Sequence, residues 1–353
     1  MSAISEKSRV DWVDYAKGLC IVLVVMMHST LGVEKAVGEA SWLNGFIAWA
    51  RPFRMPDFFL ISGLFLASRI DRPWRSYLDS KVLHFAYFYV LWMTIQFATK
   101  GHGIYQEAGA GGLAQAYLLG FIDPFGTLWF IYMLAVFFVV VKALRNVPPL
   151  AVFAAAALLE MAPVETGWVL IDEFAARFVY FFAGYWMAGR VFAFATVAGR
   201  RSSGGLIAGL TIWGIANAMF VARGWSELPG IGLVLGFIGA AAVVSFGVWL
   251  SKFRAARAIG YCGANSIVIY LAFFLFMAGS RGLLVKFAPG LDTGVMALLV
   301  TAAGVIGPLL LYWAVRHTRL SFLFRRPAWA RLALGGGGWH SRSHADITSL
   351  EAR

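Results

Sequence analysis

The sequence has 353 residues, of which 60% are hydrophobic and 14% are charged, and its net charge is +12. Soluble globular proteins carry about 25% charged and roughly 45–50% apolar residues, so this composition excludes a soluble globular protein. The basic residues lie mainly between apolar segments, which indicates a membrane surface, and we expect no nucleic-acid partner. The two cysteines, Cys20 and Cys262, have no metal-binding spacing and are interpreted as packing residues.

About ten segments are apolar and long enough to cross a membrane as helices. In chain order they cover residues 13–33, 44–67, 82–99, 127–144, 149–163, 174–196, 204–222, 229–250, 262–285 and 293–315. The fifth is short and contains Glu160, and the Gly- and Ala-rich stretch 103–122 is either re-entrant or on the surface. Lipid offers no partner to backbone polar groups, and the runs are too uniformly apolar for barrel strands. The sequence therefore predicts an all-α, polytopic transmembrane helix bundle.

The basic residues also predict the orientation of the bundle. With the N-terminus in the cytoplasm, 21 of the 30 Lys and Arg residues fall on the cytoplasmic side and six on the opposite side. This asymmetry predicts that both termini are cytoplasmic. Residues 1–330 are expected to form one transmembrane domain and residues 331–353 a disordered cytoplasmic tail. The Ala-, Gly- and Arg-rich composition favours a multi-pass protein of a bacterial inner membrane.

Three ionisable residues lie on one side of the first predicted span. Lys17 and His28 are eleven residues apart, which at ~100° per residue places them within ~20° of one face and ~16 Å apart along the axis. Asp14 lies on the same side. A charge inside a span costs roughly 2.5–3.5 kcal/mol and usually has a function. The alternatives are a Lys17 that reaches the cytoplasmic interface and a His28 that is a satisfied buried histidine.

The second span carries Arg51 and Arg54, three residues apart, and Asp57. Two prolines in this stretch make a regular helix doubtful, and Asp57 can pair with Arg54 at i, i+3. Either Arg54 forms a structural ion pair with Asp57, or the two arginines form a cationic pocket for phosphate, carboxylate or an oxyanion. Ser62 and Gly63 permit close helix packing.

A histidine beside two arginines fits acyl transfer. A neutral His28 can take a proton from a hydroxyl that attacks a thioester, while Arg51 and Arg54 stabilise negative charge on the carbonyl oxygen. The same residues fit a proton-coupled carrier equally well.

Four motifs resemble those of the membrane-bound acyltransferase family 3, in the branch of fucose 4-O-acetylase-like acetyltransferases. They are WVDYAKGLCIVLVVMMH, RPFRMPDFFLISGLFL, GTLWFIYML with Trp129 and Phe130, and GANSIVIYLAFF with Asn265, Ser266 and Tyr270. The resemblance covers roughly residues 10–330, and it fails at Ala272, where family members often have histidine.

The resemblance implies about ten helices, an acyl-CoA donor from the cytoplasm, and O-acylation, most often O-acetylation, of a carbohydrate or glycolipid. It implies that His28, Arg51 and Arg54 are catalytic and that acetyl-CoA is a substrate, with no bound cofactor or metal. Residues predicted along the substrate path are Asp14, Lys17, Asp57, Trp129, Tyr132, Asn265 and Ser266. Packing is the alternative for the two aromatic residues, and helix–helix bonding is the alternative for Asn265 and Ser266.

Two other classes of protein fit the same pattern of spans. A transporter or flippase for a polysaccharide, lipid or small anion suits ten helices and a polar second span, although the two halves of the sequence show no visible duplication. A sensory or scaffold protein would not need three cations within its spans.

Overall fold

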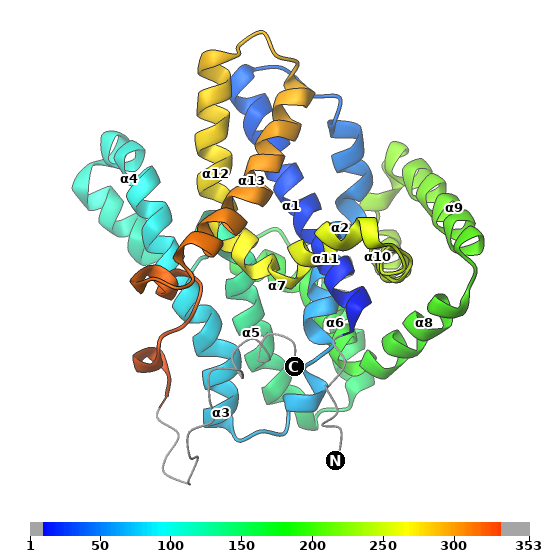
Figure 1. Cartoon of the computed structure of the whole chain (residues 1–353). Coiled ribbons are helices and arrows are strands. Elements are labelled where there is room, and N and C mark those ends of the chain that lie inside the picture. Colours follow the sequence, from blue (N-terminus) through cyan, green and yellow to red (C-terminus); the bar gives the residue numbers. More distant parts are fainter. Residues whose placement is uncertain (1–9, 333–353) are drawn as a thin grey trace, which may run out of the picture.

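The computed structural model describes residues 10–332, which form helices and turns without a strand (Figure 1). The prediction of an all-α fold is confirmed. The predicted disordered tail, residues 331–353, lies outside the described residues apart from its first two positions.

Within residues 10–332, thirteen α-helices are joined by short turns. They are α1 Asp11–Val37, α2 Asn44–Gly63, α3 Trp74–Leu78, α4 His84–Leu119, α5 Trp129–Ala143, α6 Pro149–Met161, α7 Val169–Trp186, α8 Ala188–Arg200, α9 Ser203–Ala222, α10 Ile231–Leu250, α11 Arg257–Ala264, α12 Ser266–Phe287 and α13 Thr293–Val315. A five-residue π-helical segment, η2 Asp79–Leu83, leads into α4.

Seven of these helical segments are long and apolar enough to cross a membrane, or eight if α7 and α8, bent by 76°, form one span. The protein is therefore an integral multi-pass membrane protein. The two remaining predicted spans coincide with α2 and α6. α6 has only 13 residues, and every 18-residue stretch of α2 contains Arg51, Arg54 and Asp57. All ten predicted segments are helical, while ten as the number of spans stays a prediction.

Residues 103–122 cover the end of the first half, the turn and the second half of a helical hairpin at the left of Figure 1. Gly109 makes the turn with a φ of 67°, which glycine adopts without strain. Beyond it the chain returns along the first half of α4, and the Tyr117 hydroxyl lies 2.9 Å from the Thr94 hydroxyl. The ring of Tyr117 also packs edge-on against Phe97. The Gly- and Ala-rich stretch thus forms the turn and the return segment of a helical hairpin at the side of the bundle.

α1 lies at the centre of the bundle, in contact with α2, α10, α11, α12 and α13 (Figure 1). We name the end of the bundle where α1 begins the proximal end, and the end where α1 finishes the distal end. The charge distribution predicts that the proximal end faces the cytoplasm. α1 is consequently surrounded by other helices along most of its length.

α2 remains helical through Pro52 and Pro56, so the expected irregularity does not occur. It packs against α7 through two facing glycines. A Cβ atom on Gly63 would overlap the Phe181 carbonyl oxygen, and one on Gly184 would overlap the Leu60 carbonyl oxygen. The prediction that Gly63 permits close helix packing is confirmed.

Replacing Gly63 with alanine is expected to lower the free energy of unfolding by roughly 1–3 kcal/mol, because the new methyl group forces α2 and α7 apart. Thermal unfolding of the purified protein in detergent measures the change. Gly45→Ala in the same helix is the control, since its methyl group meets open space. Equal melting temperatures for the two variants would contradict the prediction.

Candidate active site

His28 lies in the distal half of α1, which is one unbroken helix. Its position relative to Lys17 therefore follows the predicted geometry, on nearly the same face and ~16 Å along the axis. The imidazole is half-buried, and its ring centre lies 5.5 Å from that of Phe273 in α12. Among the residues that the structure describes, the cationic side chains of Arg54 and Lys100 interact electrostatically with His28.

Arg54 is buried, with 7% of its surface exposed. Its Nη2 atom contacts the Met27 sulfur at 2.8 Å, next to His28 in α1. Its Nε and Nη1 atoms are buried and have no hydrogen-bond partner among the described residues. Buried donors without partners are rare in folded proteins because each carries a desolvation cost. The two donor atoms are therefore suited to an anion, which a guanidinium binds through forked hydrogen bonds.

Asp57 is almost completely buried, and neither carboxylate oxygen has a hydrogen-bond partner among the described residues. The ion pair with Arg54 that the i, i+3 spacing allows does not form. The Arg54 side chain instead extends to Met27 of α1, while Asp57 interacts electrostatically with Cys20 and Tyr180. The reading of Arg54 and Asp57 as a structural pair is therefore wrong.

Arg51 lies apart from this buried group. Its side chain is exposed and forms an ion pair with Glu227, in the turn between α9 and α10. Exposed ion pairs contribute about 0–1 kcal/mol. Arg51 and Arg54 are about 60° apart around α2, which suffices to direct Arg51 to the surface and Arg54 to α1. The structure thus brings Arg54, but not Arg51, to His28.

The proximal end holds a second group of cations. Lys17, Arg69 and Arg72 all interact electrostatically with Lys81, which lies in the π-helical segment η2. We name these four residues the proximal cationic cluster. Asp14 is half-buried in α1, one turn before Lys17. The other three basic residues lie in the segment between α2 and α4, and tertiary packing brings them and Lys17 together.

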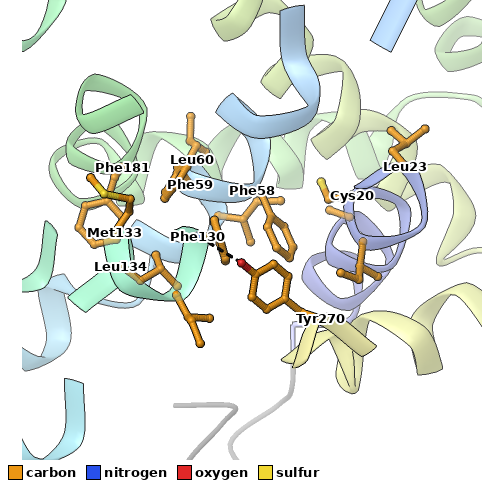
Figure 2. Close-up of a cluster of buried hydrophobic side chains, with 14 of the residues drawn as sticks. Cys20, Leu23, Phe58, Phe59, Leu60, Phe130, Met133, Leu134, Phe181 and Tyr270 are labelled. Carbon is orange, nitrogen blue, oxygen red and sulfur yellow. Dashed lines mark hydrogen bonds between the residues drawn. The ribbon is translucent and has the colours of Figure 1, made fainter. Parts of the chain in front are cut away.

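The remaining motifs form an aromatic frame between α1, α2, α5 and α12 (Figure 2). The Phe130 backbone N–H donates to the Tyr270 hydroxyl at 3.1 Å, and that hydroxyl donates to the Thr127 carbonyl. Tyr270 thereby satisfies a backbone group at the start of α5 that has no partner within the helix. Phe58 stacks on Phe130 with ring centres 4.6 Å apart, and Phe59 packs on the same ring. This frame holds the α2 segment that carries Arg54 and Asp57.

The sequence profile of one family, described as an acyltransferase domain, matches residues 10–313. The chain belongs to the acyltransferase 3 family. It is also 26% identical over 291 residues to the inner membrane protein YcfT of Escherichia coli K12, an alignment that covers 75% of this chain and 78% of that protein. No solved structure matches the chain. The match is to the acyltransferase 3 family as a whole, and the fucose 4-O-acetylase-like branch stays a prediction.

In this acyltransferase 3 member, Trp129 and Tyr132 occupy packing positions. The Trp129 ring centre lies 6.0 Å from that of Phe59. The Tyr132 hydroxyl donates to the Phe121 carbonyl at 3.2 Å and so ties the end of the α4 hairpin to α5. Tyr132 also lines an apolar cavity of about 170 Å³ between these helices. Neither His28 nor Arg54 is among the residues that line this cavity.

Asn265 and Arg177 make local contacts. The Asn265 side chain donates to the Tyr261 carbonyl at 2.9 Å, at the break between α11 and α12, and Ser266 begins α12. Arg177 pairs with Glu173 at 3.1 Å, the i, i+4 contact that helical spacing allows. In residues 10–332, no three His, Cys, Asp or Glu side chains lie close enough together to hold a metal ion.

Proposed function

We propose that the protein is an O-acyltransferase of a bacterial inner membrane, which transfers an acyl group, most often acetyl, from acyl-CoA to a hydroxyl of a glycan or glycolipid. The observation that supports this activity most directly is the half-buried His28 beside a buried Arg54 with two unpartnered donor atoms. The first group accepts a proton, and the second is available to an anion. Family membership supplies the class of reaction.

In the proposed reaction, His28 takes the proton of the acceptor hydroxyl while the hydroxyl oxygen attacks the thioester carbonyl. A carbon–oxygen bond forms, the carbon–sulfur bond breaks, and the thiolate of coenzyme A leaves with the proton that His28 held. Arg54 stabilises the negative charge that develops on the carbonyl oxygen. Arg51, which is held in its surface pair with Glu227, takes no part in this step.

The proximal cationic cluster is suited to the head of the donor. Coenzyme A carries phosphate groups, and Lys17, Arg69 and Lys81 are the kind of residues that bind them. The shared face of α1 then directs the pantetheine arm from Lys17 toward His28. This arrangement accounts for the charged Lys17 at the start of an otherwise apolar helix.

Labelled acetyl-CoA supplied to inverted membrane vesicles tests the proposed function. We expect the label to become covalently attached to glycan or glycolipid in vesicles that contain the protein, and not in vesicles from cells that lack it. Label that crosses the membrane without becoming attached would refute the proposal and favour a carrier.

A further inference from the structure

Two cations on the distal side of His28 have no role in the reaction described above. Arg281, from α12, lies directly over Gly32 of α1, where a Cβ atom would overlap its Nη1 atom. Gly32 is one helical turn beyond His28, about 6 Å along the axis. The glycine therefore leaves space for a guanidinium group on the His28 side of α1.

Lys100 completes this arrangement from the α4 hairpin. Its Nζ atom lies 4.4 Å from the ring centre of Phe274, the residue that follows the Phe273 ring beside His28. A second ring, that of Phe125, lies 5.3 Å from the same nitrogen. Cation–π contacts of this kind hold the ammonium group in place without neutralising its charge. Lys100 interacts electrostatically with both His28 and Arg281.

No carboxylate compensates these two cations within the described residues. The acids at this end of the bundle make other contacts: Glu34, two residues beyond Gly32, accepts from the Ser41 backbone N–H at 2.6 Å. Asp292 accepts from the Trp42 indole and from the Val295 backbone N–H. Like charges held close together in a partly dry site repel one another, and an anion among them removes the repulsion. Lys100, Arg281 and His28 are all half-buried, so part of each side chain stays accessible.

We propose that Lys100 and Arg281, which we name the distal cationic pair, bind an anionic group of the acceptor, a carboxylate or a phosphate. The acceptor is then an acidic glycan or glycolipid whose reacting hydroxyl lies next to the charged group. This inference rests on the proposed function. The donor head and the acceptor anion occupy opposite ends of α1, with His28 between them.

Binding to the purified protein in nanodiscs tests the proposal without acyl transfer. The probes are a glucose trisaccharide, the corresponding glucuronate trisaccharide, and a trisaccharide that ends in a phosphate. We expect one or both acidic probes to bind at least tenfold more tightly than the neutral one. Lys100→Gln and Arg281→Gln should each weaken this binding about tenfold through the loss of a charge-assisted contact. Whether carboxylate or phosphate binds more tightly identifies the anion.

Lys286→Gln is the matched control, because Lys286 is an exposed cation near the same end of α12. It should leave binding of the acidic probes unchanged. Equal binding of neutral and acidic probes would overturn the proposal. It would also be overturned if the acidic probes bind more tightly but neither substitution weakens their binding. Weaker binding of coenzyme A in both variants would overturn it too, by assigning the pair to the donor. If the protein binds the acidic probes but shows no acetyl transfer, the proposed function is refuted and the anion site at the distal cationic pair remains supported.

Discussion

Acyl transfer is expected to fall by about 10²–10⁴-fold when His28 is replaced by alanine, the usual loss when a general base is removed. Every other contact on α1 remains, so the donor should still bind. The rate of label transfer from acetyl-CoA to the acceptor, at equal amounts of folded protein in the membrane, measures the effect. A loss in the rate constant with an unchanged KM for acetyl-CoA would assign His28 to the chemical step.

His102→Ala is the control for this substitution, since His102 is exposed on the α4 hairpin. It removes an imidazole from the same protein without touching the site, and its activity should match that of the wild type. Monodisperse elution and an unchanged melting temperature show that both variants are folded. Full transfer by folded His28→Ala protein would exclude a catalytic role for this residue.

Arg54→Gln is expected to lower the rate constant by about 10²–10³-fold, the loss typical of one removed oxyanion donor. Its stability should not fall with its activity. The guanidinium is buried, and its Nε and Nη1 atoms have no hydrogen-bond partner within residues 10–332, so replacing it removes a desolvated charge. We therefore expect a melting temperature equal to or above that of the wild type, measured on the same preparation.

Arg51→Gln in the same helix separates the two arginines that the sequence leaves equivalent. Its surface pair with Glu227 contributes about 0–1 kcal/mol, so both activity and stability should stay close to those of the wild type. Equal losses of activity in the two variants would show that Arg51 also reaches the reacting carbonyl. A large drop in stability for Arg54→Gln alone would indicate a structural role instead.

The local sequence pattern was sufficient to predict the helices and part of the candidate site. Apolar runs of about 20 residues mark membrane helices because lipid leaves the backbone no other way to satisfy its polar groups. The rotation of 100° per residue was enough to place Lys17 and His28 on one face of α1, since that helix is unbroken. Arg54 and Asp57 could also be singled out from the sequence, because they are charged residues inside an apolar run.

The partners of those residues depended on tertiary packing. Spacing along α2 allowed Arg54 to pair with Asp57, and the approach of Met27 from α1 decided otherwise. Lys100 reaches Phe274, and Arg281 lies over Gly32. These contacts join helices far apart in the sequence, and the turn at Gly109 shapes the hairpin that carries Lys100. Helical periodicity relates residues within one helix, whereas which faces of different helices meet depends on how all the helices pack together.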